Sequence, residues 1–255
     1  MVRGFPFRYW DPRFALAQTR RREVRERFLR SSDELMVFHS LPSWAAEFSR
    51  RHKLPNYAYL TRLLETFFAH LSRPVVVVSV NGRSLLLPSS APGLRVINLG
   101  QLRPSEYEEL LFASDLMISD NRISSSLAKA VCGLIPCVAL RNSHPLPELI
   151  DRADEPTRAL LLEMERDRPG AIFPFEVFPI WSREDLDALR LFPDNPIEAC
   201  LLTLEMYGGE ETRLAFEQLL TDPAHREKLK ARQLHYISLI CRLPKSQDAL
   251  LSLAT

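Results

Sequence analysis

The chain has 255 residues, of which 46% are hydrophobic, and 33 basic residues against 32 acidic ones leave a net charge of +1. This length and hydrophobic content suit one large α/β domain or two small ones, while the balanced charge argues against a nucleic-acid partner or an anionic membrane surface. No GxGxxG or GxxxxGKS/T motif occurs, which disfavours a standard dehydrogenase and a Walker-type ATPase.

Residues 1–30 begin with an aromatic, proline-rich stretch at 5–12 and continue as a charged helix from about Ala15. The arginines of this helix are interrupted by Glu23 and Glu26 at helical spacing, which is typical of a solvated helix face. Exposed aromatic residues beside prolines are normally covered. We therefore expect the extension either to meet a missing preceding domain or a partner chain, or to fold back on its own domain.

Six apolar runs predict strands. The run at 74–80, PVVVVSV, is apolar on both faces, which is typical of a central parallel strand covered by helices on each side. Helical periodicity between the runs predicts crossover helices, for example at 56–71 and 148–166. Right-handed crossovers then give an α/β fold, a doubly wound parallel Rossmann-like sheet. The six predicted strands are 34–38, 74–80, 94–99, 116–118, 137–140 and one within 171–180.

From residue 182 onward only helices are predicted, at 182–191, 196–207, 209–220 and 223–242. We expect three parts: an aromatic and helical extension at 1–30, a Rossmann-like nucleotide-binding domain at 31–181, and C-terminal helices packed on it at 182–255.

The stretch 115–140 predicts a strand, a polar turn, a helix and a second strand. Leu127, Ala130, Val131 and Leu134 give the helix one buried face. The turn at 119–126 is rich in short polar side chains that can cap a helix or bind an anion. Several polar loops, including this turn, follow predicted strands and therefore lie on the same edge of a parallel sheet. This convergence favours a phosphate at the start of the helix over serines that act only as caps.

The four cysteines are scattered in apolar surroundings, without a spacing that suits a metal site. No run approaches the roughly 18 apolar residues of a membrane span. The start of the chain lacks the apolar core of a signal peptide. We therefore expect a cytoplasmic protein with reduced thiols, no metal and no membrane span.

Two segments, INLGQLRPSEYEELLFASDLMISD and SSSLAKAVCGLIPCVAL, resemble the C-terminal, donor-binding half of the two-domain GT-B nucleotide-sugar glycosyltransferases. The likeness extends over about 34–242. It implies a donor nucleotide-sugar as substrate and no further cofactor. It also implies that glycosyl transfer requires an acceptor-binding domain, a partner chain or a second copy of the chain, so no catalytic residue is assigned here.

The resemblance implies a role for individual residues. The loop after the third strand would hold the nucleobase, and the polar turn would hold the diphosphate. The sequence departs from the family where Asp120, Asn121 and Arg122 replace glycines of the turn, and where Lys129 replaces the glutamate that binds ribose. Arg122 could compensate by its charge. The implied residues are Asn121, Arg122, Ser124, Ser125, Ser126 and Ser40 for the phosphates, Gly100, Leu102, Arg103 and Lys129 for the nucleobase and ribose, and Asn142 and His144 for the donor sugar.

Two other functions stay open. One is a non-catalytic binding or interaction module with a glycosyltransferase-like fold. The other is a small-molecule enzyme in which His39 or His144 acts as a general base without a second domain.

Overall fold

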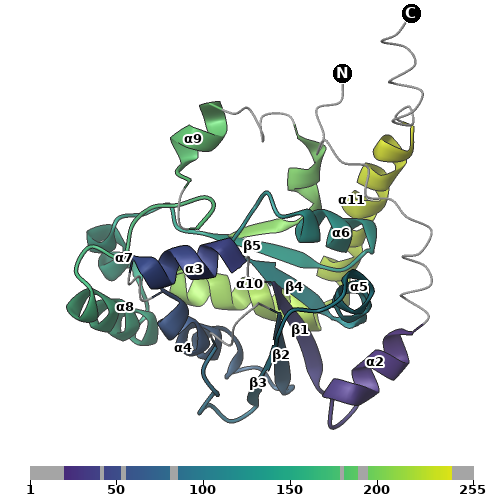
Figure 1. Cartoon of the computed structure of the whole chain (residues 1–255), viewed down its shortest axis with the longest axis horizontal. Helices are drawn as coiled ribbons and strands as arrows, with labels where there is room; N and C mark the ends of the chain where they lie inside the picture. Colours follow the sequence, from purple (N-terminus) through teal and green to yellow (C-terminus); the bar gives the residue numbers. More distant parts are fainter. Residues whose placement is uncertain are drawn as a thin grey trace, which may run out of the picture.

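The computed structural model describes residues 20–40, 43–52, 56–80, 86–178, 181–188 and 195–242. A sheet of six parallel strands forms the centre of the fold, in the order β3-β2-β1-β4-β5-β6 (Figure 1). This arrangement confirms the predicted doubly wound α/β sheet. The strands are β1 (Leu35–Ser40), β2 (Val75–Val80), β3 (Leu94–Leu99), β4 (Leu116–Ser119), β5 (Cys137–Arg141) and β6 (Leu202–Glu205).

Side chains of the strands β1 to β5 alternate between two hydrophobic cores. In β1, Leu35 and Val37 point into one core, whereas Met36 and Phe38 point into the other. The same alternation continues through β2, whose six residues are all buried. Strands buried on both faces require an apolar residue at nearly every position, which explains the continuous valine run of β2.

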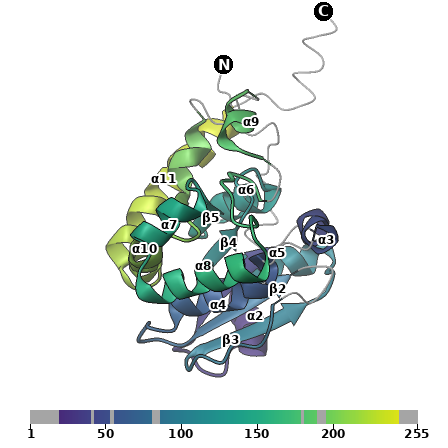
Figure 2. The same ribbon diagram turned by 90° about the vertical axis from the view of Figure 1, so that its left-hand side faces the viewer.

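Helices cover both faces of the sheet. α4, α8 and α10 contribute to the core that contains Leu35, and Figure 2 shows α4 and α8 side by side. α2, α5 and α6 contribute to the core that contains Phe38, and α11 contributes to both. The described helices are α2 (Arg21–Phe28), α3 (Ser43–Arg51), α4 (Asn56–Phe68), α5 (Pro104–Ala113), α6 (Ser125–Cys132), α7 (Leu146–Arg152), α8 (Glu155–Asp167), α9 (Arg183–Ala188), the 3-10 helix η1 (Pro196–Cys200), α10 (Gly209–Thr221) and α11 (Pro223–Cys241).

The strand order creates a switch point between β1 and β4. From β1 the chain continues outward to β2 and β3, whereas from β4 it continues the other way to β5 and β6. Crossover helices that begin on either side of such a point leave a crevice outside the carboxyl ends of the strands, where ligands of doubly wound sheets bind.

The sixth strand differs from the prediction. The segment 171–178 forms no strand and makes only isolated bridges, Phe175 with Asn142 and Val177 with Asn121 and Trp181. Pro174 lacks a backbone N–H, so it cannot donate to a strand ladder. The edge strand is instead β6, which pairs with β5 inside a stretch that was predicted to be helical.

Two further boundaries differ from the prediction. The helix expected at 148–166 is two helices, because Asp154 caps α8 by accepting a hydrogen bond from the Thr157 N–H at 3.1 Å. A cap such as that of Asp154 starts a new helix and interrupts the one before it. His39 and Ser40, which follow the predicted strand 34–38, are the last two residues of β1.

Within the described part of the chain, no helix combines the length and apolarity needed to cross a membrane. The aromatic stretch at 5–12 lies outside the described residues. The division of the chain at residues 30 and 181 stays a prediction.

Candidate functional site

Tyr107 joins the two elements that flank the switch point. Its phenolic oxygen lies 2.6 Å from Ser40 Oγ at the end of β1 and 2.7 Å from Ser126 Oγ in the first turn of α6. The ring packs edge-on against Phe38, with centroids 5.0 Å apart. Burial raises the pKa of Tyr107, so the phenol stays protonated and can donate a hydrogen bond. The structure thus brings together two of the predicted phosphate residues, Ser40 and Ser126.

The turn before α6 is held by its own short side chains. Ser124 caps the helix by accepting from the Ser126 N–H at 3.2 Å. Asn121 Oδ1 accepts from the Ile123 N–H at 3.1 Å, and Ser119 Oγ accepts from the Asn121 N–H at 3.2 Å. The side chains of Asn121 and Ser124 therefore shape the turn, while Ser125 is exposed at the first position of the helix.

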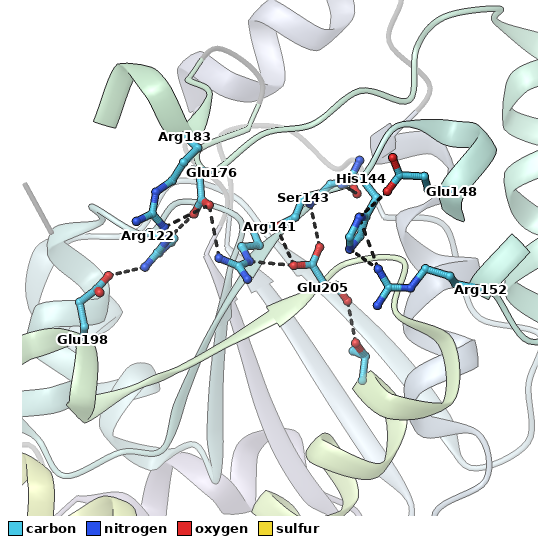
Figure 3. A network of polar contacts seen from close by, with 12 residues as sticks. Arg122, Arg141, Ser143, His144, Glu148, Arg152, Glu176, Arg183, Glu198 and Glu205 are labelled. Atoms are coloured by element: carbon cyan, nitrogen blue, oxygen red, sulfur yellow. Dashed lines mark hydrogen bonds and ion pairs between the residues drawn. The ribbon is translucent and has the colours of Figure 1, made fainter. Parts of the chain in front are cut away.

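Arg122 belongs to a buried network of charges (Figure 3). Its guanidinium contacts the carboxylates of Glu176 and Glu198, and the Arg122 and Glu176 side chains are each 5% exposed. Glu176 also pairs with Arg141 at 3.3 Å, and Arg141 pairs with Glu205 at 2.8 Å. The network connects the turn after β4 to the ends of β5 and β6 and to the segment 171–178.

The predicted nucleobase residues follow β3 at the same edge. Arg103 is the residue before α5: its backbone N–H donates to the Glu106 carboxylate at 3.1 Å, and its guanidinium pairs with the same carboxylate at 2.6 Å. Leu102 packs against the core that contains Phe38. Gly100 has open space where a side chain would lie.

Lys129, predicted near the ribose, lies one turn into α6. Its Nζ is 2.7 Å from Glu108 of α5. The contact neutralises the Lys129 charge within the chain and supplies a carboxylate in that neighbourhood.

Asn142 and His144 lie beyond the end of β5, and the hydrogen bonds of their side chains are made with residues other than Ser40 and Ser126. Asn142 is buried and donates to the Phe173 carbonyl at 2.9 Å. His144 Nδ1 is 3.1 Å from Glu148, and its Nε2 is 2.6 Å from the Arg152 guanidinium (Figure 3). A guanidinium can only donate, so Nε2 accepts this bond and Nδ1 carries the proton. A cavity of about 280 Å³ lies beside His144, Arg152 and Glu205.

His39 is a buried histidine at the switch point, 1% exposed. Its Nδ1 lies 3.1 Å from Ser79 Oγ in β2. Burial lowers the pKa of His39 to about 4, so the ring is neutral near pH 7. A ring this buried cannot reach a substrate without a rearrangement of the strand ends, which weighs against its use as a general base.

The sequence prediction missed Tyr107, Glu176 and Glu205. Tyr107 lies in α5, and its partners are 67 and 19 residues away in the chain. In the sequence, the only sign that the Tyr107 side chain points inward is the apolar face of this helix. Among the described residues, no three His, Cys, Asp or Glu side chains gather so as to hold a metal ion.

No curated protein matches the chain. Among the solved structures that match is the glycosyltransferase SnogD from Streptomyces nogalater, with a sequence identity of 15% and a TM-score of 0.40. The match covers 89% of this chain and 45% of SnogD. EarP, described in connection with arginine glycosylation of translation elongation factor EF-P, matches with 12% identity, 95% and 70% covered, and a TM-score of 0.47. The spinosyn rhamnosyltransferase SpnG matches with 14% identity, 89% and 48% covered, and a TM-score of 0.42.

The chain spans less than half the length of SnogD and of SpnG. Over residues 1–255 it matches a family described as a family of unknown function, DUF6365, and the chain belongs to that family.

Proposed function

We propose that the chain binds the diphosphate of a nucleotide-sugar at the switch point between β1 and β4. The observation that carries the proposal is the hydroxyl cluster of Tyr107, Ser40 and Ser126, which joins the end of β1 to the start of α6. In a doubly wound parallel sheet this point is where ligands bind.

The start of α6 supports a phosphate in particular. The helix has eight residues and begins with two serines, of which Ser125 is exposed. The first N–H groups of a helix and its positive end favour an anion. The hydroxyls of Ser40 and Ser126 add donors beside the same helix turn, and the nucleoside would extend toward the loop after β3.

We propose further that this chain acts as the donor-binding half of a glycosyltransferase, completed by an acceptor-binding domain, a partner chain or a second copy. Transfer requires both reactants to be held together, an effect worth up to about 7 to 11 kcal/mol. It also requires a base at the acceptor hydroxyl. His39 is buried, and His144 Nε2 already accepts from Arg152, so neither supplies that base in this arrangement.

A second candidate is a non-catalytic binding or interaction module. The observation that favours it is that basic residues of the proposed site form ion pairs with glutamates of the same chain. Arg122 contacts Glu176 and Glu198, and Lys129 contacts Glu108, so the two cations predicted to bind the phosphates and the ribose already have carboxylate partners.

Calorimetric titration with uridine, thymidine, adenosine and guanosine diphosphates separates the candidates. We expect at least one of them to bind with a micromolar to low-millimolar dissociation constant. A flat titration with all four at millimolar concentration would contradict nucleotide binding and leave the interaction module. The corresponding nucleotide-sugar, incubated with the chain alone, should show no glycosyl transfer.

A further inference from the structure

A second cavity, of about 480 Å³, lies at the amino edge of the sheet, opposite the nucleotide site proposed above. Its floor is the connection 133–136, which leads from the end of α6 to the start of β5. Its walls come from Arg21 of α2 and from one face of α11, where Pro223, Arg226 and Lys230 lie at helical spacing. Cavities of this size hold small molecules.

Three cationic side chains line this cavity: Arg21, Arg226 and Lys230. The Arg21 guanidinium is fixed, because it donates to the Phe112 and Ser114 carbonyls at 3.1 and 3.0 Å and pairs with Asp115 at 2.8 Å. The two other cations, Arg226 and Lys230, belong to α11. Phosphate groups are bound in proteins by such convergent arginine and lysine side chains.

Arg226 and Arg21 line the same cavity, and the charge of Arg226 acts on Arg21. Burial lowers the pKa of Arg21, and the charges of Arg25 and Arg226 lower it further, against the opposing effect of Asp115. Within the described part of the chain, the Arg226 side chain makes no hydrogen bond or ion pair. Two like charges that share a cavity repel each other, and an anion between them relieves the repulsion.

The local charges leave an excess that fits one phosphate monoester. Arg25 shares Asp115 with Arg21, and Glu227 lies 3.5 Å from Lys230. In and beside the cavity there are thus four cations and two carboxylates. The cations are Arg21, Arg25, Arg226 and Lys230, and the carboxylates are those of Asp115 and Glu227. The excess of two positive charges matches a phosphate monoester, which carries about −1.5 to −2 near pH 7.

The floor contains the one described non-glycine residue with positive φ. Leu134 has φ of 59°, a region that L side chains rarely adopt. Helices commonly end with a residue of this conformation just beyond the C-cap, which here is Gly133. The connection is held in this shape by hydrogen bonds from Leu134 N to the Val131 carbonyl and from Ile135 N to the Ala130 carbonyl, at 3.1 and 2.9 Å.

We propose that this cavity binds a small phosphate monoester, with Arg21, Arg226 and Lys230 holding the phosphate and with Leu134 and Pro136 against the rest of the molecule. The proposal does not depend on nucleotide binding at the carboxyl edge, because the two sites lie at opposite ends of the strands.

Calorimetry on the full chain tests the proposal, with glycerol 3-phosphate and inorganic phosphate as probes. We expect glycerol 3-phosphate to bind, and Arg226→Ala and Lys230→Ala each to weaken it about tenfold or more, the loss of one charged hydrogen bond. The matched control is Lys228→Ala, which removes a lysine from the far side of α11 and should bind like the parent. Stronger binding of glycerol 3-phosphate than of inorganic phosphate would support a phosphate monoester as the ligand. Equal binding would show a site for free phosphate and would overturn the assignment of a monoester.

Two outcomes would overturn the proposal as a whole. They are no binding of either probe at millimolar concentration, or a loss of glycerol 3-phosphate binding in Lys228→Ala as large as that in Arg226→Ala. To distinguish the two sites, each variant is tested with the ligand of the other site. Ser125→Asp should leave glycerol 3-phosphate binding unchanged, and Arg226→Ala should leave nucleoside diphosphate binding unchanged. A single variant that abolishes both would show that the cavity is not a separate site.

Discussion

The hydroxyl oxygens of Tyr107 and Ser126 lie 2.7 Å apart, which connects α5 to the first turn of α6. The same phenol reaches Ser40 at the end of β1. One side chain of α5 therefore sets the distance between the two elements on either side of the switch point, and Tyr107 is a positioning residue for the proposed phosphate site.

Tyr107→Phe should remove this connection while keeping the ring packed against Phe38. Two half-buried serine hydroxyls lose a partner, so we expect a loss of about 1 to 2 kcal/mol in the free energy of unfolding. Urea unfolding measures it. The matched control is Tyr236→Phe, since Tyr236 is a buried tyrosine whose hydroxyl makes no hydrogen bond within the described residues. A loss of equal size in both variants would contradict a role for the hydroxyl cluster.

Ser125→Asp should abolish nucleoside diphosphate binding without unfolding the chain. Ser125 is exposed at the first position of α6, where a carboxylate interacts favourably with the positive end of the helix. The same carboxylate would repel a phosphate. Calorimetry and thermal unfolding measure the two effects, with the neutral Ser125→Asn as the control. If Ser125→Asp binds as well as Ser125→Asn, the phosphate lies elsewhere.

Glu176→Gln should destabilise the fold strongly. Glu176 is buried and holds both Arg122 and Arg141, so its neutralisation leaves positive charge without full compensation. Breaking a buried ion pair costs about 3 to 5 kcal/mol. Urea unfolding should show a loss near the lower end, because Glu198 and Glu205 remain.

The control for Glu176→Gln is Asp187→Asn, which breaks the exposed pair with Arg183 on α9. Exposed pairs contribute little, so this variant should unfold like the parent. Equal stability of Glu176→Gln and the parent would show that the buried network adds nothing to the fold.

Gly133→Ala should destabilise the end of α6. A β-carbon at Gly133 would lie 2.3 Å from the Phe112 ring, which is fully buried. Overpacking of this kind costs about 1 to 3 kcal/mol. Gly100→Ala is the control, because nothing lies within 4 Å of a β-carbon there. Thermal unfolding compares the two, and equal midpoints would mean that Phe112 moves without cost.

The free energy of unfolding should decrease at acidic pH because His39 is buried as a neutral ring. The pKa of this ring is lowered from 6.5 to about 4 by burial. Between these values the unfolded chain binds a proton that the folded chain does not, so the contribution is fully present above pH 6.5 and is lost as the pH falls toward about 4. The shift corresponds to roughly 3 kcal/mol.

His39→Asn tests this assignment. Urea unfolding at about pH 7.5 and about pH 4.5 should show a smaller decrease in stability for His39→Asn than for the parent. His235→Asn, an exposed histidine of α11, should keep the parent's decrease. A decrease in His39→Asn as large as the parent's would assign the acid sensitivity to another group.

The sequence by itself determined the class of the fold and the chemistry of the turn before α6. The valine run of β2 has no polar face, so it specifies a strand between two layers of helices. Ser124 caps a backbone N–H only two residues away. Such features depend on strand and helix periodicity and on contacts within one turn, which are encoded in neighbouring residues.

Only the tertiary structure decided which segment supplies the last strand and which side chains meet at the carboxyl edge. β6 has four residues, and its place is determined by pairing with β5, from Val138 with Leu202 onward, rather than by its own propensity. Glu176 reaches Arg122 across 54 residues, and Tyr107 reaches Ser40 across 67. These contacts exist because the sheet order places β1, β4 and β5 side by side, and no periodicity within one segment carries that order.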